Sequence, residues 1–302
     1  MKLRVGIVGV GLMGHGIARN VLKHGHTLTA LDHSGNQPMG ELLEAGATTR
    51  KTPRAVAAVS DFILLCVTGS PEVEAVLSGG NGVLQDLRPG SVVIDCSTAV
   101  PESTERMARR VQEHGGAFLD APMTRTAQAA REGRLNLLVG GDTAVLEQAR
   151  PLLQTFAESI QHVGPVGAGH RLKLLHNYVS LGSVVLLAEA AACATRDGVD
   201  LKTLVGTLAA GGGAGVALER LTPYLLTGDA SGLQFSMSNA LKDLRYYLQM
   251  AAGAEASHAV GDAVAATLER AVATGNPNAL VPELVTLLGA DTPRPQPHST
   301  HH

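Results

Sequence analysis

Tryptophan is absent from this 302-residue chain, and aromatic residues make up only 3% of it. Side chains on which nucleic-acid bases could stack are therefore scarce. Charged residues make up 17% of the chain and the net charge is −3, so no long-range attraction draws it to nucleic acid or to an acidic membrane surface. These shortages argue against a polyanionic partner and favour a soluble protein with a core of alanine, valine and leucine.

Long apolar runs are also scarce. The longest, at 179–194, contains Glu189 and is shorter than the roughly 18 to 20 apolar residues that a membrane span needs. It therefore predicts a buried helix and no membrane partner. The opening segment 1–10 leads directly into a glycine motif, so we expect a strand there and not a signal peptide.

Cysteine is rare, with only Cys66, Cys96 and Cys193 in the chain. They lie far apart and each sits in an apolar run, which predicts reduced thiols in the core and a cytoplasmic location. The histidines of the terminal segment 291–302 follow several prolines, and we interpret that segment as a disordered tail with no metal site.

The length of the chain predicts two domains. Up to residue 164, short β-branched runs alternate with helical patterns, as in a doubly wound sheet of parallel strands with crossover helices. The expected strands are 3–9, 28–32, 62–67, 91–97, 117–122 and 136–141. From 165 to 290 the sequence is rich in alanine and leucine at helical spacing. We therefore predict an α/β Rossmann-type domain over 1–164 and an all-helical domain over 165–290, joined by a long helix from about Gly169 to Arg196.

The first chemical motif, GVGLMGHGIARN at 9–20, directly follows the first predicted strand. Its glycines match the G-x-G-x-x-G spacing, in which absent side chains allow a tight turn and let a pyrophosphate approach a helix N-terminus. The residues expected to contact the cofactor here are Gly9, Gly11, Leu12, Met13 and Gly14. The alternative, a glycine-rich turn without a ligand, is disfavoured because the motif has the right context.

Asp32 ends the next predicted strand, 21 residues beyond Gly11 (32 − 11 = 21). A carboxylate there accepts hydrogen bonds from the ribose hydroxyls of a dinucleotide. It would repel a 2′-phosphate, and the residues HSGNQ that follow include no arginine to bind one. The sequence therefore predicts NAD as the cofactor in preference to NADP.

A second polar group occurs in GHRLKLLHNYVS at 169–180. Lys173 and Asn177 are four residues apart and share a helix face, with His176 and Ser180 close to the same stripe. Most lysines are solvated, but the surrounding leucines and valine suggest a largely buried helix. Burial lowers the pKa of a lysine and makes it a usable general acid or base.

Together with IDCSTAVP (94–101), DAPMTRTAQAAREGRLNLLVGG (120–141) and KDLRYYLQMA (242–251), these two segments resemble the β-hydroxyacid dehydrogenase family. Its members include 3-hydroxyisobutyrate dehydrogenase and tartronate semialdehyde reductase. The resemblance covers about the first 290 residues. It implies that Lys173 is the catalytic acid/base and that Asn177 holds the substrate. It also implies that Val67 and Thr98 line the nicotinamide side of the cofactor and that Lys242 reaches the cofactor from the helical domain.

One loop departs from the family pattern. Where relatives have approximately Asp-Ala-Pro-Val-Ser-Gly-Gly, this chain has Thr124, Arg125 and Thr126 in place of Ser-Gly-Gly. An arginine flanked by two hydroxyls is a stronger anion ligand than a glycine turn. The loop is similar to that of 3-sulfolactaldehyde reductases, whose substrate ends in a sulfonate. We assign all three residues to substrate binding, with Asn177, His176 and Ser180 as the helical partners; the alternative is a surface role for Arg125.

We therefore predict an NADH-dependent reductase of a small anionic aldehyde, reversible as a dehydrogenase of the hydroxy acid. The favoured activity is that of a 3-sulfolactaldehyde or succinic semialdehyde reductase. The alternatives are a 3-hydroxyisobutyrate dehydrogenase or tartronate semialdehyde reductase and, less favoured, a non-catalytic NAD-sensing module or an imine reductase. We expect the site between the domains at the carboxyl ends of the strands. The apolar helical domain predicts a homodimer or homotetramer.

Overall fold

The computed structural model describes all residues except 1, 275, 277 and 291–302. The terminal segment that the sequence predicts to be disordered therefore lies outside the described residues. The chain divides into two compact units, which we call the first unit (Met1–Leu175) and the second unit (His176–His302). The division falls inside a helix and beyond the predicted domain boundary at residue 164, because the first turns of that helix pack on the sheet of the first unit.

The first unit contains a nine-stranded sheet with the order β3-β2-β1-β4-β5-β6-β8-β7, in which β9 also pairs with β8. Its strands are β1 (Arg4–Val8), β2 (Thr27–Leu31), β3 (Thr48–Arg50), β4 (Phe62–Leu65), β5 (Val92–Asp95), β6 (Ala117–Asp120), β7 (Met123–Thr124), β8 (Leu135–Gly140) and β9 (Ala157–Gly164). All six predicted strands are present. The short strands β3 and β7 and the largely exposed β9 were not predicted, because they lack a buried β-branched run.

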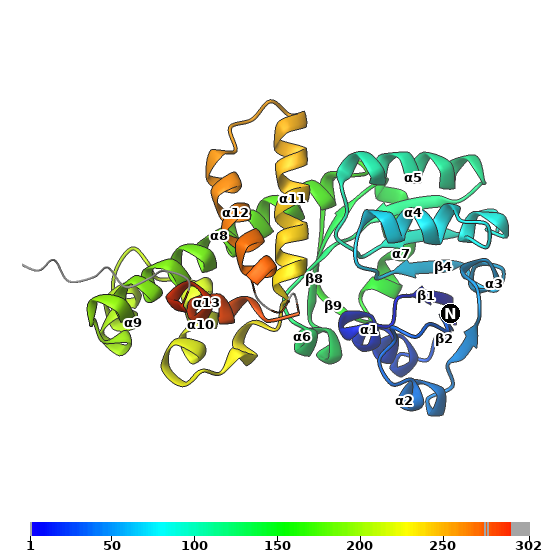
Figure 1. The fold of residues 1–302 in the computed structure, drawn as a ribbon. Coiled ribbons are helices and arrows are strands. Elements are labelled where there is room, and N and C mark those ends of the chain that lie inside the picture. Colours follow the sequence, from blue (N-terminus) through cyan, green and yellow to red (C-terminus); the bar gives the residue numbers. More distant parts are fainter. Residues whose placement is uncertain (1, 275, 277, 291–302) are drawn as a thin grey trace, which may run out of the picture. The chain divides into compact units, whose positions relative to one another are not determined.

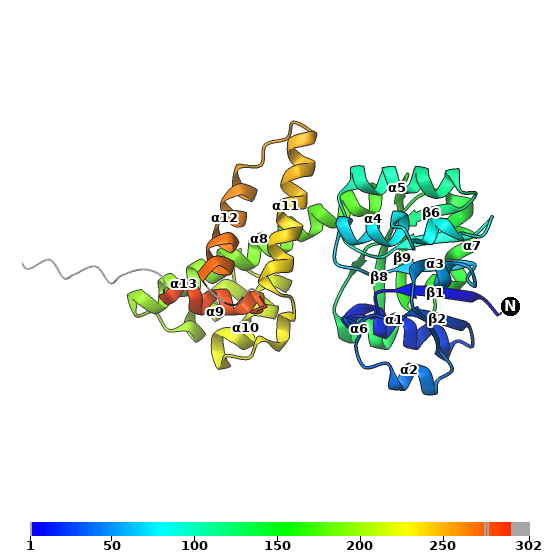
Figure 2. The same cartoon turned by 45° about the vertical axis from the view of Figure 1, so that its right-hand side comes forward.

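Helices cover both faces of this sheet (Figure 1, Figure 2). They are α1 (Leu12–Lys23), α2 (Gly40–Glu44), α3 (Pro53–Ala57), α4 (Ser70–Ser78), the 3₁₀ turn η1 (Val83–Gln85), α5 (Pro101–Glu113), α6 (Ala127–Glu132) and α7 (Thr143–Leu153). Alternate strand residues face opposite sides: Ile7 joins the core under α1, α2, α6 and α7, whereas Val8 joins the core under α3, α4 and α5. The predicted doubly wound fold is confirmed.

One part of the prediction needs correction. Strands β1 to β6 are mutually parallel, but β8 runs antiparallel to β6, with Asp120 opposite Gly140. The link between β6 and β8 holds only the two-residue β7 and the six-residue α6. Strand β7 pairs directly with β8, with Thr124 opposite Asn136, so the chain turns back on itself without a crossover.

The second unit is all-helical, as expected. Its elements are α8 (Ala168–Asp197), which begins in the first unit, α9 (Leu201–Ala209), α10 (Val216–Thr227), η2 (Ala230–Leu233), α11 (Met237–Gly253), α12 (Ala259–Thr274), η3 (Val281–Glu283) and α13 (Leu284–Ala290). The rings of Tyr178 and Tyr247 stack with centroids 4.0 Å apart. Gly261 on α12 permits this stack, because a Cβ there would lie 3.0 Å from the Tyr247 ring.

Helix α8 matches the predicted long helix within one residue at each end. By length and hydropathy alone it could cross a membrane, but a core helix of a soluble protein passes the same test. Leu181, Val184 and Val185 of α8 are buried in the core of the second unit. In contrast, the expectation of a largely buried segment around Lys173 was wrong in part. Leu174 is fully buried, but Leu172, Leu175 and Val179 are exposed and Lys173 is half-buried.

The three cysteines are free, but they do not share one environment. Cys96 is buried and Cys66 is half-buried, in agreement with the prediction of core thiols. Burial raises the pKa of the Cys66 thiol to about 12 and also raises that of Cys96, so both stay protonated near neutral pH. The prediction was wrong for Cys193, which is exposed on α8, because an apolar stretch of sequence does not reveal which side of a helix is covered.

Candidate active site

The glycine motif forms the turn between β1 and α1, and its three glycines meet different constraints. Gly9 has φ +96°, and a Cβ there would lie 2.2 Å from the carbonyl oxygen of Cys66. A Cβ on Gly14 would lie 2.0 Å from the carbonyl oxygen of Gly9. A Cβ on Gly11 would meet nothing within 4 Å. The fold therefore requires glycine at positions 9 and 14, because a side chain there would collide with the backbone. Gly11 leaves open space at the N-terminus of α1, where the sequence predicts that the pyrophosphate of a dinucleotide binds.

Asp32 follows β2, and its carboxylate is exposed at the end of that strand. It forms an ion pair with Lys51, which lies one residue beyond β3. This cation was not predicted from the sequence, because β3 was not expected as the neighbour of β2. Lys51 neutralises part of the charge that would repel a 2′-phosphate, so the electrostatic argument for NAD is weaker than Asp32 alone suggests.

Val67 and Thr98 follow the adjacent parallel strands β4 and β5. The backbone N–H of Val67 donates to Ser97 Oγ at 3.1 Å, and the N–H of Ser97 donates to Asp95 Oδ1 at 2.9 Å. Two predicted cofactor residues are thus connected through Ser97. This edge of the sheet, where β1, β4 and β5 end, is the expected position of a nicotinamide group in such a fold.

Lys173 lies on the second turn of α8, and a buried carboxylate fixes the start of this helix. Asp120 Oδ1 accepts from the N–H of Gly167 at 2.7 Å, and Oδ2 accepts from the N–H of His170 at 2.9 Å. A carboxylate at a helix N-terminus satisfies N–H groups that the helix leaves open and complements its dipole. A Cβ on Gly169 would lie 2.3 Å from the carbonyl oxygen of Leu138, so the helix also starts in close contact with β8.

Asn177 lies four residues after Lys173 on α8 and is buried. Its Nδ2 donates to Asp243 Oδ2 at 2.6 Å, and its Oδ1 lies 3.0 Å from His176 Nδ1. Asp243, 2% exposed, also forms an ion pair with Lys242 at 2.9 Å. The two predicted residues Asn177 and Lys242 are therefore joined by a buried carboxylate that was not predicted from the sequence, although Asp243 directly follows Lys242 in the KDL segment.

Lys242 also lines a pocket of 360 Å³ within the second unit. The pocket is bordered by Ser238, Leu241, Lys242, Arg245, Tyr246 and Val272. The Lys242 ammonium lies 5.2 Å from the centre of the Tyr246 ring, a cation–π distance. Ser180, the last predicted residue of the α8 stripe, is half-buried one turn after Asn177.

The loop 124–126, predicted to bind the substrate, places its three residues in different surroundings. Thr124 belongs to β7 and is half-buried. Thr126 Oγ1 accepts from the N–H of Ala129 and caps α6, so this hydroxyl has a structural role. Arg125 donates to the carbonyl oxygen of Arg134 at 2.9 Å and forms an ion pair with Glu158 of β9. An anionic substrate would have to compete with Glu158 for the guanidinium.

Arg125 has φ +81°, a conformation that favours glycine. An arginine held there costs roughly 1 to 3 kcal/mol relative to an unstrained backbone. The loop therefore keeps a backbone shape suited to the glycine expected in relatives at this position, although the side chain is different. The assignment of Arg125 to substrate binding remains a prediction.

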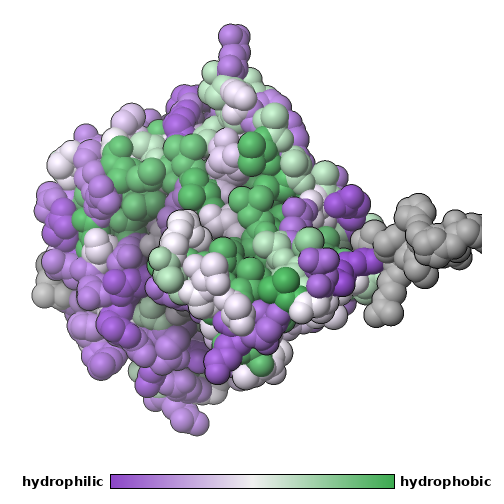
Figure 3. All heavy atoms as spheres, turned by 90° about the vertical axis from the view of Figure 1, so that its left-hand side faces the viewer, coloured by the Kyte–Doolittle hydropathy of each residue, from purple (hydrophilic) through white to green (hydrophobic). Residues whose placement is uncertain are grey.

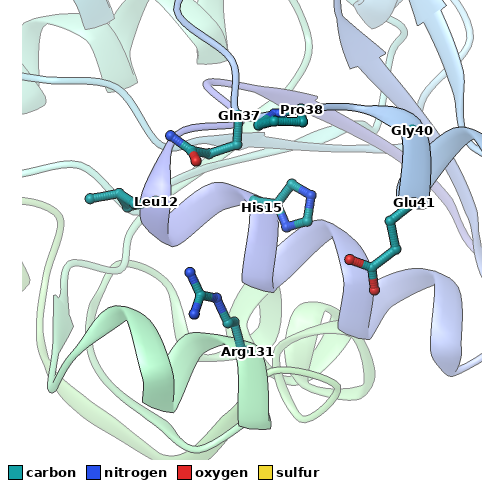
Figure 4. Close-up of a pocket in the computed structure, with 7 residues that line it drawn as sticks. All are labelled: Leu12, His15, Gln37, Pro38, Gly40, Glu41 and Arg131. Atoms are coloured by element: carbon teal, nitrogen blue, oxygen red, sulfur yellow. The ribbon is translucent and has the colours of Figure 1, made fainter.

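A second pocket, of 380 Å³, lies beside the glycine motif (Figure 4). Leu12 and His15 of α1, Gln37 and Glu41 of the α2 region and Arg131 of α6 line it, and Figure 4 shows the Arg131 guanidinium reaching toward α1. Glu41 pairs with Arg19 at 2.7 Å. Leu12 belongs both to this pocket and to the predicted cofactor-binding segment.

A model described as the NAD binding domain of 6-phosphogluconate dehydrogenase matches residues 4–164. A second, described as NAD-binding of NADP-dependent 3-hydroxyisobutyrate dehydrogenase, matches residues 167–288. The chain belongs to the β-hydroxyacid dehydrogenase family. It is accordingly an oxidoreductase that uses a nicotinamide dinucleotide and acts on the CH–OH group of hydroxy acids.

The relatives act on different acids. The chain is 32% identical over 249 residues to 2-(hydroxymethyl)glutarate dehydrogenase of Eubacterium barkeri, a match that covers 82% of each chain. It is 36% identical over 198 residues to 2-hydroxy-3-oxopropionate reductase of Escherichia coli K12, covering 66% of this chain and 67% of the relative. A structure of Mycobacterium tuberculosis 3-hydroxyisobutyrate dehydrogenase with L-serine has a TM-score of 0.85 at 24% identity, covering 96% of this chain and 100% of that one, and supports the fold.

The glycine geometry generates a matched prediction. Gly14→Ala should lower the melting temperature, even though alanine in a helix is normally favoured over glycine by about 1 kcal/mol, because its Cβ would collide with Gly9. Gly11→Ala should keep the native melting temperature and weaken NADH binding, because its methyl group enters the space left for the pyrophosphate. Thermal unfolding and NADH titration of both variants test this; Gly11→Ala with native NADH affinity would contradict the placement of the cofactor.

Proposed function

We propose that the protein is an NADH-dependent reductase of a small aldehyde with an acidic group, and that it also oxidises the corresponding hydroxy acid. The observation that carries the proposal is the spacing of Lys173 and Asn177, one turn apart on α8, with the Asn177 amide oriented by Asp243. A sensor that only binds the dinucleotide would have no use for a proton donor next to an oriented amide. Catalysis therefore explains this arrangement better than a non-catalytic role.

The dinucleotide, when bound, supplies the hydride for reduction. The chain must then orient the carbonyl group and deliver a proton. In the proposed reduction, the Lys173 ammonium gives a proton to the carbonyl oxygen, and the resulting amine regains one from solvent. In oxidation, the neutral amine takes the hydroxyl proton. Because Asp243 accepts one N–H of Asn177 at 2.6 Å and Asn177 Oδ1 lies 3.0 Å from His176 Nδ1, the amide cannot rotate freely. In this proposal its remaining N–H is the group that binds the substrate.

For the acidic end of the substrate, we retain Arg125 with Thr124 as the proposed ligands. A guanidinium forms charge-assisted hydrogen bonds to two oxygens at once, and a sulfonate has a third oxygen that the Thr124 hydroxyl would bind. This chemistry supports 3-sulfolactaldehyde as the first substrate to test. The ion pair with Glu158 favours a second candidate, a carboxylate semialdehyde such as succinic, methylmalonate or tartronate semialdehyde, bound by backbone N–H groups of the loop while Arg125 stays on Glu158.

We also propose that the enzyme is a homodimer or homotetramer. Leu186, Val216 and Val260 of the second unit are 59%, 56% and 60% exposed, and α9 contains no buried residue although it is largely apolar. Figure 3 shows apolar side chains gathered on the face that lies on the α9 side of Figure 1. Patches of this kind usually mark interfaces. Sedimentation velocity tests this, and a monomer at micromolar concentration would contradict it.

A cytoplasmic location is proposed as well, because three free thiols suit a reducing compartment. Cell fractionation followed by immunodetection measures it directly, and recovery from an oxidising compartment would contradict it.

Lys173→Ala should lower kcat with the best aldehyde by about 10² to 10⁴-fold, the usual contribution of general acid–base catalysis. NADH affinity should change little, because the glycine motif and Asp32 remain intact. Steady-state kinetics and NADH titration check both statements. A variant that retains more than about a tenth of native kcat would place the proton donor elsewhere.

For Arg125, the informative variant is Arg125→Gly, because glycine accepts φ +81° and the loop backbone is preserved. If the guanidinium binds the substrate, kcat/KM for an acidic aldehyde should fall about 10-fold or more, while neutral aldehydes are unaffected. Glu158→Gln should act in the opposite direction, raising kcat/KM by at most about fivefold, because it removes an exposed competing ion pair.

Two measurements test the proposed binding of the substrate anion by Arg125. Unchanged efficiency in both variants would reduce Arg125 to a surface partner of Glu158. A comparison of sulfolactaldehyde with succinic semialdehyde in the native enzyme decides between the two anions, since a preference for the carboxylate would remove the sulfonate proposal.

Cofactor choice is tested at Asp32. We expect NADH to be preferred over NADPH by about tenfold or more, because the carboxylate faces the position of a 2′-phosphate. Asp32→Ser should shift the ratio toward NADPH, and Lys51→Ala should shift it further toward NADH by removing the nearby cation. The readout is kcat/KM for both cofactors in the three proteins; a native preference for NADPH would show that Lys51 outweighs Asp32.

A further inference from the structure

His170, on the first turn of α8, is fully buried although it is polar. Its ring contacts two other elements: Nδ1 lies 2.8 Å from Thr104 Oγ1 on α5, and Nε2 lies 3.1 Å from the carbonyl oxygen of Ser97, in the loop after β5. Its backbone N–H donates to Asp120 at the end of β6. One residue thus joins the start of α8 to α5, to β6 and to the β5–α5 loop, all within the first unit.

The hydrogen-bond partners of the His170 ring limit which of its nitrogens carry a hydrogen. A backbone carbonyl only accepts, so Nε2 must carry a hydrogen and donate to Ser97. Nδ1 then accepts from the Thr104 hydroxyl in the neutral ring, or donates to it in the charged ring, in which case Thr104 can donate to the carbonyl oxygen of Val100 at 3.2 Å. In both states the bond to Ser97 keeps the same direction. The ring position is therefore fixed by that bond whichever way Thr104 points.

Ser97 connects this ring to the predicted nicotinamide side of the site. Its hydroxyl accepts from the N–H of Val67, its N–H donates to Asp95, and its carbonyl oxygen accepts from His170. Thr98 is the next residue. Lys173 lies three residues after His170, on the same side of the helix. A continuous series of bonds therefore runs from Val67 through Ser97 to the helix turn that bears Lys173.

We propose that His170 is a positioning residue: through Ser97, its ring sets the position of Lys173 relative to the loop that carries Val67 and Thr98. This inference rests on the proposed function, in which Lys173 is the proton donor. Hydride and proton reach the same carbonyl group, so the two sides of the site must keep a fixed separation. A displacement of about 1 Å at such a site can lower the rate by 10²-fold.

The buried surroundings of His170 make the protein sensitive to the loss of its ring. Asp95 and Asp120 lie opposite one another on β5 and β6, both fully buried, and Asp95 Oδ2 has no hydrogen-bond partner among the described residues. The His170 ring is itself fully buried, so a bond lost here leaves a buried polar group without its partner, which costs free energy. Removing the ring should shift the first turn of α8. That shift should lower the rate of hydride transfer and leave the affinity for NADH nearly unchanged.

Four single variants test this. His170→Leu removes both ring bonds, His170→Gln can restore the donor to the Ser97 carbonyl, and His170→Asn can restore only the partner of Thr104. Thr104→Val is the mild control, because it removes one bond without changing the ring. For each, the melting temperature, the NADH dissociation constant and the single-turnover rate of hydride transfer, followed by NADH absorbance, are measured at a temperature where every variant is folded.

We expect His170→Leu to slow hydride transfer by about 10- to 100-fold with less than about a threefold change in NADH affinity. His170→Gln should recover more of the rate than His170→Asn, because the bond to Ser97 carries the positioning. Thr104→Val should stay within about threefold of native. If His170→Leu does not fold, the Gln and Asn comparison and Thr104→Val still decide the question.

The inference is overturned if His170→Leu, folded, transfers hydride within twofold of the native rate, or if His170→Asn recovers as much as His170→Gln. It is also overturned if the melting temperature falls while the rate below that temperature is native, since the ring would then serve stability alone. Lys173→Ala in the same assay distinguishes a failure of the proposed function from a failure of the inference about His170. A fast Lys173→Ala defeats the proposed function itself, whereas a slow Lys173→Ala with a fast His170→Leu defeats only this inference.

Discussion

The Asp120 carboxylate determines where α8 begins, and the position of the proposed chemistry depends on it. It is fully buried at the end of β6, accepts two N–H groups from the start of the helix, and faces the N-terminal end of the helix dipole. With Gly169 in close contact with Leu138, this contact fixes the first turn against the sheet. The His170 ring of the same turn also bonds to the carbonyl oxygen of Ser97, and Lys173 and Asn177 follow along the helix at positions set by its geometry.

Much of the first unit could be predicted because its strands are buried and short. A strand such as β4, with all four residues buried, appears in the sequence as an apolar run. Strand β3 has no such run, since only one of its three residues is even half-buried, and β9 is mostly exposed. The pairing that places Lys51 beside Asp32 depends on β3, so the local electrostatics could not be inferred without it.

The site was predictable to the extent that its residues lie close together in the sequence. Lys173 and Asn177 are related by helical spacing, and the glycine motif by its own turn. Asp243 lies 66 residues from Asn177, and Glu158 lies 33 residues from Arg125. The spacing of residues within one segment cannot predict contacts between residues so far apart in the sequence. The role proposed for His170 could not be predicted for the same reason, because its ring contacts Thr104 and Ser97, which are distant from it in the sequence.

Family membership establishes the type of reaction more firmly than the substrate. Relatives at 32% and 36% identity are named for different acids, so the family accommodates several side groups on one scaffold. We propose that the difference lies in a few residues around the proposed proton donor. In this chain, the loop 124–126 departs from the pattern expected of the family, and under the proposed function its side chains are the first to test for substrate choice.

The left-handed backbone at Arg125 has an evolutionary consequence. A position that already has the shape suited to glycine can exchange glycine and arginine without rebuilding the loop, and several codons for these two amino acids differ by a single base. Such an exchange would relieve or introduce backbone strain only at that residue, and the neighbouring β7 and α6 would keep their pairing and cap. Members of this family could therefore gain or lose a cationic side chain in this loop in one mutational step, with the fold unchanged.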